Sequence, residues 1–533
     1  MEKKKKYSFL VALVIIALVG FIYSSLNVFT AINSIEQVLR IINDNYVNDV
    51  DITELLERAI EAIVDTLDSH SSYLKEKDFK DLMIHTEGEF GGLGIQVSKR
   101  GEYITIIAPI EGTPAYEAGL LQGDKIIKID GISTKDMDLD KAVSMMRGAP
   151  GTKVTLTISR EGMDKPIDYT IVRAIIKIKS VPYAGLIKPN IGYIAINSFS
   201  KTTPNELKVV LDSLIDLGAN KFILDLRNNP GGILDVAAKV ASFFIEKKKE
   251  IVYTEGKNTK DFYYSDDGAY SEYPLVVLVS SFSASGSEIV AGAIQDWDRG
   301  LLIGSRTFGK GSVQRIYRLP GNRALKLTIA RYHTPSGRCI DRELVKDTTR
   351  IYYTKGPLHR KVKGGGGIVP DSVLEIKYSP FFERIYRYSF DFVVEYLAKH
   401  PGVEEVTPSM IEAFKSKVKE SLKKDSLEFA ENIEFLKNFP DTVKLTEDVS
   451  REILRRVKEY LQRETGKPIG FSEEEWDKSL NEIKRELKIR VAYNKKGIKG
   501  RYEASIPEDE HIQVALKILK TAKTPKDVFS LKR

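Results

Sequence analysis

The stretch from Leu224 to Gly232 reads LDLRNNPGG and marks the transition on which the fold of the chain depends. Its first residues continue a short apolar strand, and Pro230, Gly231 and Gly232 form a turn before a helical pattern begins. Two glycines leave the backbone N–H groups at the start of that helix unobstructed. Such groups can receive a negatively charged oxygen, for example the oxyanion of acyl transfer. Taken alone, the stretch is better explained as an ordinary tight connection.

On both sides of this turn, apolar strands alternate with helices. Lys221–Leu226 and Leu275–Val279 read as buried strands, and Ile233–Phe244 and Ser285–Ile294 read as helices. Continuously apolar strands are covered on both faces, and their alternation with helices is typical of an α/β layer. We therefore predict an α/β core in the part of the chain that follows residue 190.

A serine-rich stretch lies between the second strand and the second helix, and it reads SFSASGSE from Ser281 to Glu288. A nucleophilic serine is often found at a strand-to-helix turn, where its hydroxyl is exposed near a helix N-terminus. Ser285 and Glu288 also match a capping box, in which the serine merely caps the helix. The residues alone favour capping, and they do not choose among the neighbouring serines.

A lysine flanked by glycines follows in the stretch GKGSVQ, from Gly309 to Gln314. Lysine acts as a general base only if burial lowers its pKa from about 10.4 toward about 7 or 8, and flanking glycines permit the close packing that buries it. The segment Gly304–Lys310 also resembles a phosphate-binding P-loop. That interpretation fails, because Gly311 replaces the Ser or Thr that binds magnesium and a strand-like sequence follows.

Composition excludes several classes of protein. The chain has 533 residues and should divide into three or four units. Its formal charge of +7 is spread along the sequence without a basic stripe, which argues against nucleic acid as a partner. The six histidines are scattered, Cys339 is the one cysteine, and no metal-binding motif occurs. We therefore expect no disulfide and no metal site.

The N-terminus carries a targeting signal. Lys3–Lys6 precede the apolar run Phe9–Tyr23, and no clean cleavage site follows between Ser24 and Ala31. This pattern predicts an uncleaved membrane anchor, with a cleaved signal peptide as the alternative. The lysines would stay in the cytoplasm, so that everything after residue 31 lies outside it.

Three further regions have patterns of their own. Residues 32–85 show the periodicity of amphipathic helices, interrupted by turn-forming residues at Leu67–Ser72. Residues 87–173 read as short strands around one helix, with a hairpin signal at Asp130-Gly131. Beyond residue 376 the sequence predicts long Lys/Glu-rich helices, which include Ile411–Leu422, Val449–Arg463 and Glu473–Leu487. Gly364–Gly367 reads as a flexible junction before this tail.

Together, the motifs resemble those of the carboxyl-terminal processing (tail-specific) serine proteases, and the resemblance spans most of residues 36–375. The order along the chain is LDSHSSY, a PDZ-like segment, DLRNNPGG, SASGSE, FGKGSVQ, YHTPSGR and the closing GIVPD. Several motifs in one order are far more specific than any single motif. The resemblance implies an α/β fold: a crotonase/ClpP-like protease core with an inserted PDZ-like β domain, N-terminal helices and an α-helical C-terminal extension.

The resemblance also implies roles for individual residues. Ser285 would be the nucleophile, Lys310 the general base, and Gln314 the residue that holds the lysine amine. Backbone N–H groups of Gly231, Gly232 and Gly286 would bind the oxyanion; the family more often has alanine at position 286. In the PDZ-like segment, Gly92-Leu93-Gly94-Ile95 resembles the loop that receives a chain terminus. The pocket for the last side chain of the bound peptide would be lined by Ile95, Val143 and Met146.

We therefore predict five parts: an anchor at 1–31, a helical region at 32–86, a PDZ-like domain at 87–173, a protease core at 174–375 and a helical extension at 376–533. The resemblance implies an endopeptidase without a cofactor that acts on proteins or peptides with free C-termini. We expect a membrane-anchored enzyme on the periplasmic side of the inner membrane, or a periplasmic one if the signal is cleaved. A homo-oligomer is possible.

Overall fold

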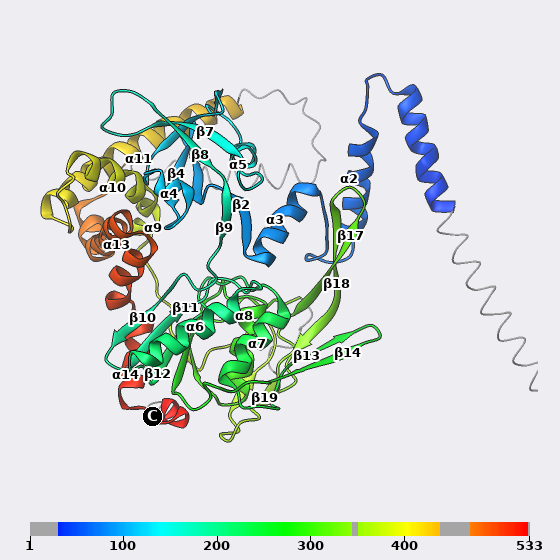
Figure 1. Cartoon of the computed structure of the whole chain (residues 1–533), viewed down its shortest axis with the longest axis vertical. Coiled ribbons are helices and arrows are strands. Elements are labelled where there is room, and N and C mark those ends of the chain that lie inside the picture. Colours follow the sequence, from blue (N-terminus) through cyan, green and yellow to red (C-terminus); the bar gives the residue numbers. More distant parts are fainter. Residues whose placement is uncertain (1–29, 344–349, 438–469, 531–533) are drawn as a thin grey trace, which may run out of the picture. The chain divides into compact units, whose positions relative to one another are not determined.

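The computed structural model describes residues 30–343, 350–437 and 470–530, which divide into two compact units (Figure 1). The first unit contains the described residues up to Phe79 together with Gln314–Ile329, and the second contains Lys80–Val313 and the described residues from Ala330 onward. The apolar run Phe9–Tyr23 and the predicted helix Val449–Arg463 lie outside the described residues. Within the described ranges, no helix is both long and apolar enough to span a bilayer.

The first unit combines helices with a β-hairpin. A helix at residues 30–45 precedes α2 (Ile52–Asp65), which begins where the Asp51 side chain accepts hydrogen bonds from the N–H groups of Thr53 and Glu54. The predicted interruption after α2 leads into β1 (Ser72–Leu74), which pairs with β18 (Arg323–His333) in antiparallel fashion. The hairpin itself consists of β17 (Ser312–Leu319) and the adjoining part of β18.

In the second unit, the protease sheet has six strands in the order β10-β11-β12-β15-β16-β21. Their bounds are Tyr183–Lys188, Ile191–Ala195, Lys221–Asp225, Leu275–Val279, Leu301–Gly304 and Ser372–Val373. All neighbours are parallel except β10 and β11. Three helices cover one face of this sheet, namely α6 (Thr203–Asp216), α7 (Leu234–Phe244) and α8 (Gly286–Asp296). The predicted α/β layer is confirmed.

The other face of the sheet is covered by the end of the chain. Ile223 and Val276 point to this face and pack with Ile512 and Leu519 of α14 (Glu510–Thr521). Complete burial of each such side chain stabilises the fold by about 1.5–3 kcal/mol. The red helix α14 lies beside the sheet in Figure 1. The last helix of the extension is thus part of the protease core.

The PDZ-like strands and helix predicted from the sequence are present. The main sheet has the order β3-β4-β5-β7-β8, with β6 (Ile132–Ser133) on β5 and with bounds Ile95–Arg100, Tyr103–Pro109, Lys125–Ile129, Lys153–Ser159 and Ile167–Val172. The predicted hairpin at Asp130-Gly131 joins β5 to β6. Helix α5 (Leu139–Met146) packs on this sheet, and β2 (Glu89–Gly92) pairs with β9 (Ala174–Lys177) at its base.

The C-terminal extension forms a helical bundle before it returns to the protease sheet. Its helices are α9 (Pro380–Ile385), α10 (Ser389–Lys399), α11 (Pro408–Lys437) and α13 (Glu473–Ser505), which contain the helices predicted at Ile411–Leu422 and Glu473–Leu487. Phe392, Phe414 and Trp476 lie at the centre of its core.

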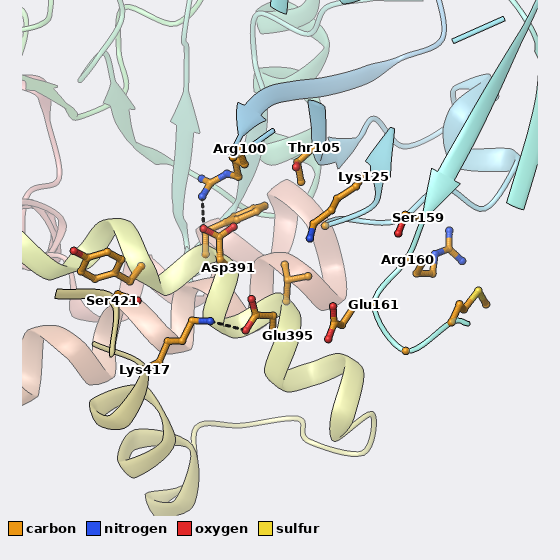
Figure 2. Close-up of a pocket in the computed structure, with 17 residues that line it drawn as sticks. Arg100, Thr105, Lys125, Ser159, Arg160, Glu161, Asp391, Glu395, Lys417 and Ser421 are labelled. Atoms are coloured by element: carbon orange, nitrogen blue, oxygen red, sulfur yellow. Dashed lines mark hydrogen bonds and ion pairs between the residues drawn. The ribbon is translucent and has the colours of Figure 1, made fainter. Parts of the chain in front are cut away.

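This bundle contacts the PDZ-like domain near the ends of its strands β3, β5 and β7 (Figure 2). Arg100 of β3 donates a hydrogen bond to Asp391 of α10 at 2.8 Å, and its guanidinium lies 4.2 Å from the centre of the Phe390 ring. These residues border a cavity of about 440 Å³, which Lys125 and Glu395 also line. Figure 2 shows the second ion pair at this cavity, between Lys417 and Glu395 at 2.9 Å.

Candidate active site

Ser285 occupies the turn between β15 and α8, at the carboxyl end of the parallel sheet. Its backbone adopts φ 49° and ψ −111°, a conformation that non-glycine residues rarely adopt and that nucleophilic serines adopt at sharp strand-to-helix turns. Ser283 and Ser287 are fully buried, and their hydroxyls donate to the carbonyls of Leu226 and Asn229. Ser285 is only half-buried. The structure thus separates Ser285 from two serines that sequence could not distinguish from it.

Glu288 makes the capping contact with Ser285 that the sequence suggested. Its Oε2 atom accepts a hydrogen bond from the Ser285 N–H at 2.8 Å, while the Glu288 N–H donates to the Ser285 carbonyl. The Glu288 N–H, from which a capping serine hydroxyl would accept, lies 2.8 Å from the Ser285 carbonyl oxygen. Capping by the Glu288 side chain is therefore compatible with a free role for the hydroxyl, and the two interpretations of the sequence do not exclude each other.

The same carboxylate contacts the loop that carries Lys310. Glu288 Oε1 accepts from the Thr307 hydroxyl at 2.5 Å and the Gly309 N–H at 2.7 Å, and Oε2 accepts from the Lys310 N–H at 2.9 Å. Its side chain is completely buried. Burial raises the pKa of Glu288 to about 7, against the lowering effect of the hydrogen bonds that it accepts.

A buried tyrosine makes a second link between the two segments. The Tyr332 hydroxyl lies 2.6 Å from the Lys310 carbonyl oxygen and 3.1 Å from the Ser285 carbonyl oxygen. Burial raises the pKa of Tyr332 well above its usual value, so this hydroxyl keeps its proton. The backbones of Ser285 and Lys310 are thus linked twice, by the Glu288 carboxylate at their N–H groups and by the Tyr332 hydroxyl at their carbonyl groups.

The glycine run Gly364–Gly367 was predicted to be a flexible junction, but in the structure it is buried. All four residues are buried, and a Cβ atom at Gly367 would lie 2.4 Å from the Thr307 carbonyl oxygen. The Thr307 N–H donates to Ile368, and the Thr307 hydroxyl accepts from it. The run is therefore not an exposed linker, and at Gly367 it packs against the loop of Lys310 too closely for a side chain.

The glycine turn after β12 lies directly against Ser285. A Cβ atom at Gly231 would lie 2.8 Å from Ser285 Cβ and 2.8 Å from the Gly286 nitrogen. The Gly231 N–H donates to the Asn229 side chain at 2.8 Å, so this predicted oxyanion donor is already engaged. Within the described part of the chain, the N–H groups of Gly232 and Gly286 have no hydrogen-bond acceptor, and these two remain candidates.

Gln314 belongs to the first unit, where it takes part in a chain of hydrogen bonds. Its Nε2 atom donates to the Thr328 hydroxyl at 3.3 Å, and that hydroxyl donates to Asp68 at 3.1 Å. Burial acts to raise the pKa of Asp68, but hydrogen bonds from Ser71, His70 and Thr328 lower it to about 2. A carboxylate can only accept, so the Thr328 hydroxyl points its proton at Asp68 and accepts from the Gln314 amide.

The PDZ-like residues lie on or beside β3 and α5. Leu93 and Met146 are buried in the core of this domain, and Ile95 and Val143 are half-buried at its edge. Gly94 packs against the Thr113 side chain, whose hydroxyl donates to the Gly94 carbonyl. The sequence predicted Met146 as a pocket residue; its burial in the core leaves Ile95 and Val143 as the more accessible ones.

Four contributors to these arrangements were missed from the sequence. Glu288 was seen only as half of a capping box, although its position three residues after Ser285 was visible. Asp68 and Tyr332 lie inside motifs that were quoted without a role for them, and Thr328 carries no local signal. In the described ranges, no group of three or more His, Cys, Asp or Glu side chains could hold a metal ion.

Comparison with known proteins identifies the family of the chain. Residues 190–351 match the model of peptidase family S41. A carboxy-terminal-processing protease of Bartonella bacilliformis is 43% identical over 330 residues, which cover 61% of this chain and 75% of that protein. The chain belongs to the carboxy-terminal processing proteases.

Further comparisons report partial similarities of this carboxy-terminal processing protease and the domains that it contains. The protease CtpA of Bacillus subtilis is 38% identical over 307 residues, 57% of this chain and 66% of that one. A solved photosystem II D1 C-terminal processing protease is 25% identical, covers 64% of this chain and 93% of its own, and has a TM-score of 0.36. Residues 105–160 match a PDZ domain, and residues 386–519 match the C-terminal helical domain of probable PDZ-proteases. The chain is therefore a serine protease with a PDZ domain.

Proposed function

We propose that this protease cleaves extracytoplasmic proteins near or from their C-termini through a Ser285–Lys310 dyad. The observation that carries the proposal is the single Glu288 oxygen that accepts from the N–H groups of both residues, at 2.8 and 2.9 Å. No other serine of the stretch combines a strained backbone with a hydroxyl that is not buried in a structural hydrogen bond. The N-terminal apolar run supports the extracytoplasmic location.

In this mechanism, uncharged Lys310 takes the Ser285 proton as the hydroxyl oxygen attacks the scissile carbonyl. The N–H groups of Gly232 and Gly286 stabilise the oxyanion, and each such donor contributes about 3 kcal/mol. The Lys310 ammonium then protonates the leaving amine, and water hydrolyses the acyl-enzyme. Gln314 holds the lysine amine, as the resemblance to the family implies.

The PDZ domain supplies substrate capture. A peptide C-terminus would add as a strand beside β3, with its carboxylate at Gly92–Ile95 and its last side chain near Ile95 and Val143. The same proposal divides the chain into five parts: an anchor at 1–31, a helical region at 32–86, the PDZ domain at 87–173, the protease core at 174–375 and the helical extension at 376–533. A membrane location through the anchor, and self-association, belong to the same proposal.

The test compares residues 32–533 with a Ser285→Ala variant on peptides and on an unfolded protein, with and without a metal chelator. Cleavage that survives the chelator and disappears in the variant is the expected result. Lys310→Ala should be equally inactive, because the proposed mechanism has no other group that takes the Ser285 proton. Full activity of either variant would overturn the dyad.

A further inference from the structure

Arg227, three residues before the turn Pro230–Gly232, is held by hydrogen bonds from two sides. Its Nε and Nη2 atoms donate to Asp225 at 3.0 and 2.6 Å, and its Nη1 atom donates to Asp509 at 2.8 Å. Nη1 also lies 3.3 Å from His511 Nδ1. Asp509 and His511 stand 282 and 284 residues further along the chain, at the start of α14.

The contacts of Arg227 are largely buried. Asp225 cannot take over the hydrogen bonds that Arg227 makes with Asp509 and His511. The side chain of Arg227 is 17% exposed, and that of Asp509 is 11% exposed. Asp225 also accepts hydrogen bonds from the Tyr193 hydroxyl at 2.6 Å and from the Arg227 N–H at 2.9 Å. Because every acceptor position of Asp225 is in use, the Nη1 end of the guanidinium depends on Asp509 and His511.

The orientation of the histidine ring follows from its second contact. His511 Nε2 lies 3.0 Å from the Leu374 carbonyl oxygen, which can only accept. Nε2 therefore carries the proton, and the lone pair of Nδ1 faces the Arg227 N–H. The imidazole thus connects Arg227 to the strand end after β21, whose Leu374 N–H in turn donates to the Gly304 carbonyl.

The turn beyond Arg227 depends on where that residue lies. Asn228 adopts φ 59°, and its N–H donates to the Ser280 side chain at 3.1 Å. The Asn229 carbonyl accepts from the Ala284 N–H at 3.0 Å, next to Ser285. Because the backbone runs from Arg227 through this turn to Gly232, we infer that a displacement at Arg227 would shift the Gly232 N–H relative to Ser285, and oxyanion donors act only at about 2.7–3.1 Å.

We propose that Asp509 and His511 are positioning residues of the protease, through which the C-terminal extension sets the oxyanion-binding turn by fixing Arg227. The proposal rests on the role of Gly232 in the proposed function. It gives the extension a part in catalysis in addition to its part in the fold. Neither residue touches the substrate.

The test uses the same chain, residues 32–533, with Asp509→Asn. Asparagine retains the oxygen that caps α14, which Ile512 N–H contacts at 3.2 Å, and removes the charge that faces Arg227. We expect kcat to fall about tenfold to a hundredfold with KM within twofold, because a displaced donor affects the transition state and not capture by the PDZ domain. His511→Phe should behave alike, and Asp509→Glu should recover part of the loss.

The matched control is Asp527→Asn, the same change at a carboxylate that caps the 3₁₀ helix Pro525–Phe529 through the N–H groups of Lys523 and Thr524. It should leave kcat unchanged. Circular dichroism at the assay temperature ensures that only folded variants are compared. An unchanged kcat for folded Asp509→Asn, or an equal loss for Asp527→Asn, would overturn the proposal.

A second measurement separates this proposal from the dyad itself. The rate at which a fluorophosphonate phosphonylates the enzyme, with fluoride as the leaving group, should fall in Asp509→Asn and should be zero in Ser285→Ala. Labelling of Ser285→Ala at the wild-type rate would refute the nucleophile and not the positioning role. Wild-type labelling of Asp509→Asn, with Ser285→Ala unlabelled, would refute the positioning role alone.

Discussion

The Oε2 atom of Glu288 accepts a hydrogen bond from the backbone N–H of Lys310 at 2.9 Å. The same atom accepts from the Ser285 N–H, and Oε1 binds the Thr307 hydroxyl and the Gly309 N–H. All four groups are donors, and the carboxylate is completely buried among them. One side chain thus fixes the distance between the backbones of the proposed nucleophile and base.

Glu288→Gln should therefore reduce kcat about a hundredfold, because the amide NH₂ would face an N–H donor and push the two segments apart. A buried donor left without a partner also costs about 1–3 kcal/mol of stability. The measurement is kcat together with the free energy of unfolding in urea. Glu482→Gln is the control, since Glu482 accepts the Ser379 N–H in the helical extension. Equal losses of kcat in both variants would contradict this role.

The pH dependence of stability should carry the signature of Glu288. Its pKa is raised to about 7, so the folded state keeps a proton that the unfolded state releases near pH 4.5. The free energy of unfolding should therefore fall as pH rises from about 4.5 to about 7, by up to about 3 kcal/mol from this group. Urea titrations from pH 4.5 to 8 measure this slope. Glu288→Gln should lack it, and an unchanged slope in the variant would show that other groups are responsible.

Gly231 should tolerate no side chain. It adopts φ 104°, and a Cβ atom there would lie 2.7 Å from the Ala284 carbonyl oxygen. Gly218→Ala is a matched control, because Gly218 has φ 95° and open space around it. In the control, the free energy of unfolding should fall only by roughly 1–2 kcal/mol, the cost of placing alanine in a left-handed conformation. Gly231→Ala should lose more stability and nearly all cleavage; activity similar to that of the control would show that the turn can move.

Thr328 should matter for catalysis only through Gln314. Thr328→Val removes the hydroxyl that donates to Asp68 and accepts from Gln314, and we expect kcat to fall about tenfold, since the Gln314 amide would lose the orientation that its proposed role requires. Thr328→Ser should retain activity. In a Gln314→Ala background, Thr328→Val should add little, because the two changes interrupt one chain of hydrogen bonds. Fully additive losses of kcat would exclude the connection.

Local patterns predicted much of this fold. The strand Leu275–Val279 has its predicted bounds, and the helix predicted at Ile233–Phe244 begins one residue later and ends as predicted, because an apolar run and a glycine turn act within a few residues. Ser285 and Lys310 were found from motifs whose order along the chain was specific, not from their chemistry.

The remaining features depend on contacts between distant segments. The continuous apolar character of β12 required a cover on both faces, but nothing in it indicated that α14 supplies the second cover. The four donors on Glu288 come from Ser285, Thr307, Gly309 and Lys310, and only the first was visible as a capping partner. The pair of Arg227 with Asp509 spans 282 residues, beyond any periodicity.

The contact between the PDZ domain and the helical extension gives a last prediction. A Cβ atom at Gly123 would lie 2.1 Å from the Val394 Cγ1 atom of α10, whereas one at Gly119 would meet nothing within 4 Å. Both glycines have positive φ, at 90° and 79°, so alanine costs the same backbone energy at either site. Gly123→Ala should therefore be less stable than Gly119→Ala by about 1–3 kcal/mol, the cost of overpacking. Arg100→Ala, which removes the neighbouring pair with Asp391, should narrow this difference, because a loosened interface accommodates the methyl group. Thermal melts of Gly123→Ala and Gly119→Ala, each with and without Arg100→Ala, measure this difference in stability. Equal stability of Gly123→Ala and Gly119→Ala would show that the PDZ domain does not rest on α10 in solution.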